Sequence, residues 1–152
     1  MPLEKKTIWL LVADSAKARL FGVDRRERRL EPLGEWQDDV ASGKAQDIDA
    51  DRPGRTFDSA GPGRHAMEPP SSPKGVAKAR FVAMLADNLA AKAKQNGFDE
   101  LHLIAAPRTL GEFRELLDPA VKARVAHEEA KDLTQLSKPE LEKLLGSRFW
   151  PV

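Results

Sequence analysis

The chain has 152 residues, of which 41% are hydrophobic and 32% charged, and its 25 lysines and arginines nearly balance 24 aspartates and glutamates. A chain of this length buries roughly 68–70% of its unfolded surface, which suits one domain over residues 1–152. The formal net charge of +1 gives no overall attraction for nucleic acid or an anionic membrane, so such a role needs a local patch. The absence of cysteine excludes disulfides, a thiolate nucleophile and cysteine-based zinc sites.

The sequence also bears on location. No apolar run approaches the ~18 residues needed to cross a bilayer. The N-terminus lacks the small-residue cleavage site of a secretory signal. We therefore expect a cytoplasmic protein that has no membrane partner.

The N-terminal region has the pattern of three strands. Residues 7–14 form a near-continuous apolar run, which is typical of a strand buried on both faces. Residues 18–23 continue in β-favouring side chains, so the two segments are expected to pair as a hairpin. The next turn, 24–29, carries four arginines. A third strand is expected over 30–36, at an edge of the sheet because Pro32 cannot donate to a ladder.

Residues 38–75 have a different composition. This segment holds five of the eleven prolines and five of the ten glycines, and few of its residues are large and apolar. A long segment without periodicity is uncommon inside a compact domain and is usually functional or disordered. We expect one long loop here.

Helices and strands then alternate to the end of the chain. Apolar residues at helical spacing predict a helix over 76–96, and a second apolar run predicts a buried strand over 101–106, parallel to the first strand. A Thr-x-x-Glu capping box predicts a short helix over 109–117. Alternation predicts a strand with one solvated face over 121–127. A Ser-x-x-Glu capping box opens a last helix over 137–146, closed by a glycine.

The resulting order is β-β-β-α-β-α-β-α, the element order of ribonuclease-H-like folds. The expected fold is therefore α/β, with a mixed five-stranded sheet and helices on its faces. One core is expected to contain the apolar residues of both buried strands and of the first long helix. These residues are Ile8, Leu10, Val12, Leu85, Leu89, Leu101 and Leu103.

This fold invites a nuclease hypothesis in which Asp14, at the end of the first strand, binds Mg²⁺. Two-metal chemistry needs several converging carboxylates, and the 101–106 strand carries none. Asp14 also suits a hairpin turn, in which its side chain accepts hydrogen bonds from nearby backbone. We favour the turn, keep the nuclease as an alternative, and assign no metal ligand. His102 is interpreted as a packed, hydrogen-bonded core residue and His127 as solvated.

No other catalytic or cofactor motif is recognised: the sequence contains no Gly-x-Ser-x-Gly, no Walker A sequence, no Gly-x-Gly-x-x-Gly after the first strand and no His-Glu-x-x-His. We expect no cofactor. The candidate chemistry lies in residues 51–69, where arginines and a histidine alternate with glycines. Glycines allow close approach of the backbone to a ligand, and arginines offer bidentate contacts to phosphate. The alternative is a solvated loop whose arginines pair with Asp49, Asp51 and Asp58.

Short strings spread over nearly the whole chain carry a family resemblance. They are Val12–Phe21, Arg52–Ser59, Gly61–Ala66, Glu68-Pro69, Arg80-Phe81 and Lys131–Thr134. Together they resemble the bacterial host attachment protein family, which is named for a role in attachment to host cells. The most specific part is the string Pro-Gly-Arg, Phe-Asp-Ser and Gly-Arg-His-Ala.

That family is similar to bacterial relatives of the archaeo-eukaryotic peptide-chain release factors. Their middle domain has a ribonuclease-H-like core, and a glycine-rich loop before a long helix carries a Gly-Gly-Gln tripeptide into the ribosome. Gly61–His65 stands in a similar place here, before the helix that contains Arg80-Phe81. No Gly-Gly-Gln occurs in the chain, so the release reaction is not implied.

The resemblance and the loop together suggest a ribosome- or tRNA-associated binding module with a second basic patch at Arg25–Arg29. The expected ligand-binding residues are Arg52, Gly54, Arg55, Asp58, Ser59, Gly61, Gly63, Arg64 and His65. Two alternatives stay open. One is a hydrolase of peptidyl-tRNA-type esters in which His65 is catalytic, and the other is a protein that takes part in attachment to host cells. The sequence leaves enzymatic activity and the oligomeric state undecided.

Overall fold

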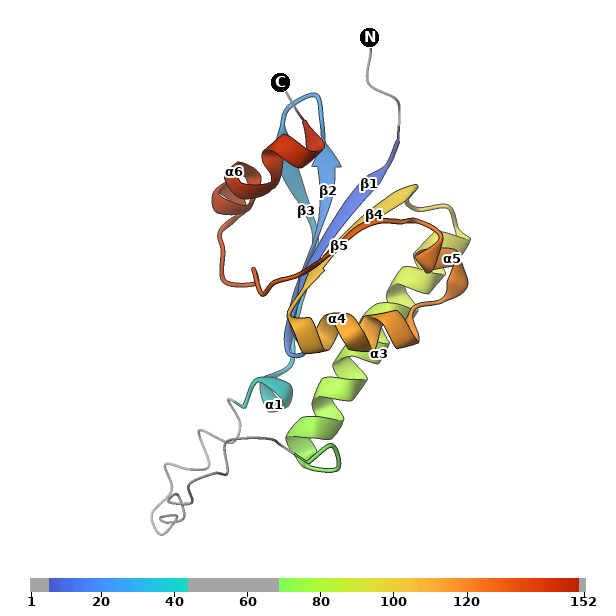
Figure 1. The fold of residues 1–152 in the computed structure, drawn as a ribbon, viewed down its shortest axis with the longest axis vertical. Coiled ribbons are helices and arrows are strands. Elements are labelled where there is room, and N and C mark those ends of the chain that lie inside the picture. Colours follow the sequence, from blue (N-terminus) through green and yellow to red (C-terminus); the bar gives the residue numbers. More distant parts are fainter. Residues whose placement is uncertain (1–5, 44–68, 151–152) are drawn as a thin grey trace.

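We describe a computed structural model of the chain, which covers residues 6–43 and 69–150. Its centre is a five-stranded sheet in the order β3-β2-β1-β4-β5 (Figure 1). β1 and β2 pair antiparallel, as do β2 and β3, whereas β4 runs parallel to both β1 and β5. The strands are β1 (Ile8–Ala13), β2 (Lys17–Asp24), β3 (Arg29–Gln37), β4 (Glu100–Ala105) and β5 (Val125–Ala130). The mixed sheet and the edge position of β3 are as expected from the sequence.

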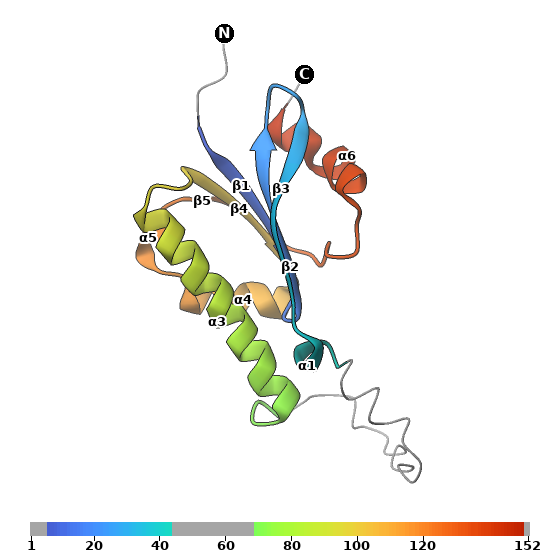
Figure 2. The same ribbon diagram turned by 180° about the vertical axis from the view of Figure 1, so that it is seen from behind.

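Helices cover the two faces of the sheet unequally (Figures 1 and 2). The long helix α3 (Pro73–Lys94), α4 (Pro107–Leu116) and the single turn α5 (Pro119–Lys122) lie on one face. Of the helices that the structure describes, only α6 (Lys138–Phe149) packs on the other. The short helix α1 (Asp39–Ser42) follows β3. Within the described ranges, no helix is both long and apolar enough to span a membrane.

The expectation of one shared core is wrong. Because successive side chains of a strand point to opposite faces, Leu10 lies on the α6 face while its neighbour Leu11 lies on the α3 face. The α3-side cluster includes Leu85, Leu89, Leu101 and Leu103, and the α6-side cluster includes Ile8, Leu10, Val12, Leu141 and Leu145. The sheet therefore separates two hydrophobic cores.

Two expected elements, the strand over 121–127 and the long loop over 38–75, have different bounds. Residues 121–124 are not strand: the Asp118 side chain accepts a hydrogen bond from Ala120 N at 2.9 Å and caps α5 instead, and β5 starts at Val125. The expected loop 38–75 contains α1 and the first residues of α3. The rest of that loop, residues 44–68, lies outside the described residues.

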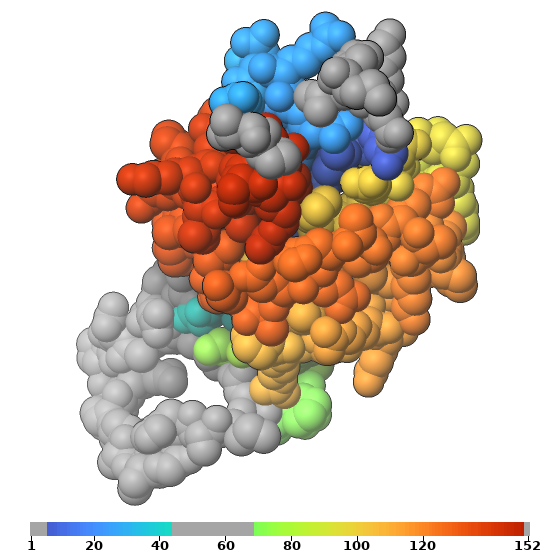
Figure 3. Space-filling model, turned by 45° about the horizontal axis from the view of Figure 1, so that its top comes forward, coloured from blue at the N-terminus to red at the C-terminus, as the bar shows by residue number. Residues whose placement is uncertain are grey.

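The last helix also differs at its end. Its capping box is present as expected, with Ser137 and Glu140 bonding each other's backbone N–H groups. Gly146 does not close the helix, which continues to Phe149. Instead, a Cβ at Gly146 would come within 2.7 Å of the Trp150 indole nitrogen, so this glycine makes room for a tryptophan. Figure 3 shows α6 seated against the β2–β3 hairpin, where Leu30 N donates to Glu142 at 2.6 Å.

Candidate functional site

The carboxyl ends of the parallel strands β1 and β4 meet at a pocket of about 370 Å³. In open α/β sheets, ligands bind beyond the carboxyl ends of the strands, where connections leave in opposite directions. Here β1 leads into the β2 hairpin and β4 leads into α4. The pocket is lined by Asp14, Ser15, Ala16, Ala41, Ser42, Lys74, Lys78, Ala106, Arg108 and Thr109.

Asp14 is held by its own turn. One carboxylate oxygen accepts hydrogen bonds from the backbone N–H groups of Ala16 and Lys17, both at 2.7 Å. The other lies 3.3 Å from the hydroxyl oxygen of the buried Thr134, which donates more closely, at 2.6 Å, to Asp132. The predicted turn role of Asp14 is therefore confirmed. In the described part of the chain no three acidic or histidine side chains are placed to hold a metal ion.

A pair of hydroxyl groups joins β1 to α4. Ser15 Oγ and Thr109 Oγ1 are 2.8 Å apart, and Thr109 is fully buried. Thr109 thus does not cap a helix as its Thr-x-x-Glu pattern predicts, since α4 already begins at Pro107. The N-cap residue Ala106 makes no side-chain cap bond. The N–H groups of the first turn of a helix have no acceptor within that helix, so this end of α4 presents partial positive charge to the pocket.

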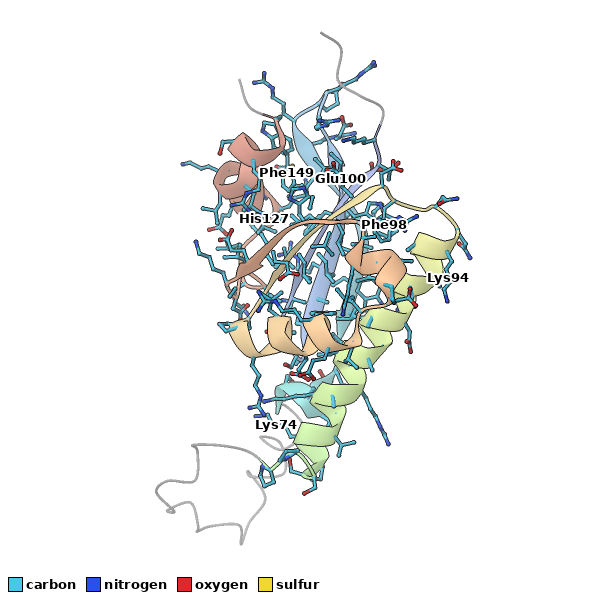
Figure 4. All side chains as sticks on the ribbon, turned by 45° about the vertical axis from the view of Figure 1, so that its right-hand side comes forward. Lys74, Lys94, Phe98, Glu100, His127 and Phe149 are labelled. Carbon is cyan, nitrogen blue, oxygen red and sulfur yellow. The ribbon has the colours of Figure 1, made fainter. Side chains whose placement is uncertain are left out.

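Three cationic side chains line the same pocket. Lys74 and Lys78 come from successive turns at the start of α3, and Arg108 comes from the first turn of α4. Figure 4 shows Lys74 at the end of α3 nearest α1. Glu112 of α4 interacts with two of these charges: burial raises the pKa of its carboxyl group, and Arg108 and Lys78 oppose that rise. Apart from the Asp14 carboxylate, already bonded to its turn, the lining side chains are cations, hydroxyls and alanines.

The segment 44–68 is joined to the chain beside this pocket. On one side, Gly43 ends α1 with a φ of 88°, and a Cβ there would lie 3.3 Å from Lys74 Nζ. On the other side, Gly75 packs so closely on the backbone of Pro69 and Pro70 that a Cβ would come within 2.6 Å. All the ligand-binding residues expected from the sequence, Arg52 to His65, lie within that segment and so outside the described residues.

A second cluster of charges lies on the opposite face, between α6 and strands β4 and β5. Glu129 accepts hydrogen bonds from His127 at 3.2 Å and Arg148 at 3.0 Å and pairs with Lys131 at 3.1 Å. These contacts, chiefly the one from His127, lower the pKa of Glu129 to about 2. His127, expected to be solvated, is therefore part of an ion-pair network.

His102 lies beside His127, with 6.0 Å between the ring centroids, and packs against the last turn of α6. Its ring meets Phe149 edge-on at 4.8 Å, and its side chain is only 11% exposed. It is packed as expected but not hydrogen-bonded as expected, because its buried Nδ1 has no partner. Burial lowers the pKa of His102; Glu100 opposes this, while His127 and Arg148 add to it.

The arginine-rich turn 24–29 is a tight connection between β2 and β3. Asp24 accepts hydrogen bonds from the N–H groups of Arg26 and Glu27 at 3.1 and 3.0 Å. Its other oxygen lies 3.9 Å from Arg29 Nε. The predicted turn is confirmed.

Comparison with known proteins bears on the family. No curated protein matches the chain. Residues 9–145 match the model of a family described as "Protein required for attachment to host cells". The match spans most of the chain and includes every residue lining the carboxyl-end pocket. The chain therefore belongs to this host attachment family.

Proposed function

We propose that the protein is a binding module for RNA, associated with the ribosome or with tRNA, and that the carboxyl-end pocket binds backbone phosphate. The observation that carries the proposal is the gathering of Lys74, Lys78 and Arg108 around one cavity at the ends of β1 and β4. A protein of net charge +1 needs such a local patch to bind a polyanion.

The chemistry of the lining groups suits phosphate. A guanidinium such as that of Arg108 can make two parallel hydrogen bonds to phosphate, and a lysine supplies a compact charge. The uncapped start of α4 adds backbone N–H donors beside Arg108. In the sequence, Arg52, Arg55 and Arg64 lie between α1 and α3. These three arginines and His65 remain proposed ligand contacts.

The kinship with release-factor middle domains is part of this proposal. The strand order, with three antiparallel strands followed by two parallel ones, supports a ribonuclease-H-like core. The Gly61–His65 string precedes α3 in the chain, as the catalytic loop precedes the long helix in those factors. Since Gly-Gly-Gln is missing from the sequence, the proposal is limited to binding. His65→Ala tests the hydrolase alternative, because loss of ester turnover with retained RNA binding would establish catalysis.

The family match favours a second function, attachment to host cells. The description attached to the family names the outcome and no ligand. Antibody labelling of intact cells, without permeabilisation, tests a direct role at the surface. Labelling would place the protein where it can contact a host. Absence of labelling would restrict the protein to an indirect role.

Sedimentation of a cell lysate on a sucrose gradient tests the main proposal. We expect the protein to migrate with ribosomal particles, and the double variant Lys78→Met/Arg108→Met to shift to the top of the gradient. Lys143→Met is the matched control, because Lys143 is exposed on α6, away from the pocket. Wild-type protein found only at the top of the gradient would contradict the proposal.

A further inference from the structure

A second cavity, of about 610 Å³, lies between α3 and the β1–β3 half of the sheet. The C-terminal half of α3 diverges from the β2–β3 hairpin (Figure 2), and the cavity occupies this angle. Its volume falls in the range of about 300–1,000 Å³ that is typical of small-molecule sites. Its lining is Trp9, Leu11, Leu20, Leu33, Trp36, Leu85, Asn88, Leu89, Lys92, Gln95 and Gly97, so it shares no residue with the carboxyl-end pocket.

Two indole rings in this lining are held in place by the sheet. Trp9 stacks on Phe98 with a centroid distance of 4.7 Å. The six-membered ring of Trp36 covers Gly34, where a Cβ would come within 2.7 Å of it. A glycine at this position therefore lets the indole lie against β3. Both tryptophans are only half-buried, and both line the cavity.

The polar groups of the cavity come from one side of α3. Asn88 and Lys92 lie four residues apart, on one side of α3, and Gln95 is the C-cap residue three positions further on. The two carboxamides can each donate and accept hydrogen bonds. Lys92 carries a positive charge and makes no ion pair with any residue that the structure describes.

We propose that this cavity binds a single nucleotide unit. Its base stacks on Trp36, the edge of the base is hydrogen-bonded by Asn88 and Gln95, and its phosphate lies at Lys92. A flat ring alone would need only the indoles, and an aliphatic anion would need only the lysine. A nucleotide uses the aromatic wall, the carboxamides and the charge together, as nucleobases do when they stack on aromatic side chains and bond through their edges.

A free mononucleotide and one nucleotide of an RNA strand share this chemistry. The proposal for free nucleotide does not depend on the RNA-binding function, whereas the strand version rests on it. Competition separates the two sources: an oligoadenylate that displaces bound AMP places a strand nucleotide in the cavity. Failure of the oligonucleotide to compete identifies the free nucleotide as the ligand.

Isothermal titration of the full chain with AMP, adenosine and ribose 5-phosphate tests the proposal. We expect AMP to bind, adenosine to bind about tenfold more weakly because the contact to Lys92 is lost, and ribose 5-phosphate not to bind measurably. Trp36→Leu should weaken AMP binding by about tenfold or more, since stacking supplies much of the affinity. Asn88→Leu should also weaken AMP binding. Because Asn88 is exposed on α3, this variant replaces Trp36→Leu in the test if Trp36→Leu fails to fold.

Lys92→Met should abolish the difference between AMP and adenosine. Lys94→Met is its matched control, because Lys94 is an exposed lysine of the same helix that does not line the cavity (Figure 4). Absence of AMP binding at millimolar concentration would overturn the inference. So would AMP binding that survives both Trp36→Leu and Asn88→Leu, or that is lost in Lys78→Met/Arg108→Met, since the nucleotide would then lie in the carboxyl-end pocket. Loss of RNA binding in that double variant with AMP binding intact would leave both proposals standing.

Discussion

The two charged regions of the molecule, one on the α6 face and one at the carboxyl ends of β1 and β4, are built differently. Around Glu129, one carboxylate contacts His127, Lys131 and Arg148, so the side chains of this cluster are engaged with one another. At the carboxyl-end pocket, Asp14 is engaged by the backbone of its own turn, and Lys74, Lys78 and Arg108 are among the residues that line a cavity. Similar residue types therefore hold α6 against β5 in the Glu129 cluster, whereas those at the carboxyl-end pocket line a cavity that we propose binds an anion.

The largest effect on the free energy of unfolding should come from substitutions in the two hydrophobic cores. Leu103 on the α3 face and Leu141 on the α6 face are both fully buried. Truncation of either to alanine should lower the free energy of unfolding by about 2–5 kcal/mol. Urea denaturation measures this. If the denaturation midpoint of either variant is unchanged, that leucine does not belong to a packed core.

A smaller change in the free energy of unfolding, of opposite sign, should distinguish the N-terminus of α4 from that of α6. α6 has a complete capping box, whereas α4 has Ala106 at its N-cap, beside the pocket. Ala106→Asp should stabilise the fold by about 1 kcal/mol, because aspartate is a strong N-cap residue. The same carboxylate would repel phosphate, so RNA binding should weaken. A variant with unchanged or stronger RNA binding would remove the start of α4 from the phosphate site.

The α6 face should respond to pH through His102. Because its pKa in the folded state lies below 6.5, the unfolded chain takes up a proton first as the pH falls, and stability declines below about pH 6.5. Urea midpoints at about pH 7.5 and about pH 5.5, roughly one unit either side of the unfolded pKa, measure the decline. His102→Leu should reduce it, and an equal decline in that variant would assign the effect to other groups.

Glu129 should affect the stability of the fold at a lower pH than His102 does. Its folded pKa of about 2 against 4.5 means that its stabilising contacts are fully present above about pH 4.5 and are lost as the pH falls towards 2. Acid titration of the wild type and of Glu129→Gln, followed by circular dichroism, measures this. Coincident acid transitions in the two proteins would show that the network does not stabilise the fold.

The smallest effect on stability is expected in the segment that follows α1. Arg55→Ala should change the free energy of unfolding by no more than about 0.5 kcal/mol, as for a surface substitution. It should nevertheless flatten the salt dependence of RNA binding by nearly one unit of slope. A salt slope identical to that of the wild type would exclude Arg55 as a phosphate contact.

Much of the sheet could be predicted because its signals are local. The apolar runs that became β1 and β4 needed no partner to be recognised, and Pro32 indicated an edge strand. The region before β5 was misread because Val121, Ala123 and Val125 alternate like a strand, while the decisive signal, Asp118 capping a turn that begins at Pro119, was assigned only to the end of the previous helix. Strand alternation also implies two cores, because neighbouring residues of β1 point to opposite faces of the sheet, but the sequence analysis assigned them to one.

The carboxyl-end pocket was less predictable. Lys74 and Lys78 on α3 are distant in sequence from Arg108 on α4, and they come together because both helices pack on the same face of the sheet. The position of Ser15 and Arg108 directly after two buried strands was the available signal. Thr109 was misassigned because its Thr-x-x-Glu pattern predicts a cap, whereas its hydroxyl pairs with Ser15. The residues that the sequence did single out, from Arg52 to His65, stay predictions.

The central claim, that the carboxyl-end pocket binds RNA phosphate, is tested most directly by the salt dependence of tRNA binding. Each phosphate contact contributes about −0.7 to −0.9 to the slope of log affinity against log salt. The slope of the wild type should be roughly −2 to −5, and Lys78→Met/Arg108→Met should flatten it by about 1.5 units while Lys143→Met leaves it unchanged. Equal slopes in the wild type and the double variant, or tRNA binding indifferent to salt, would contradict the account.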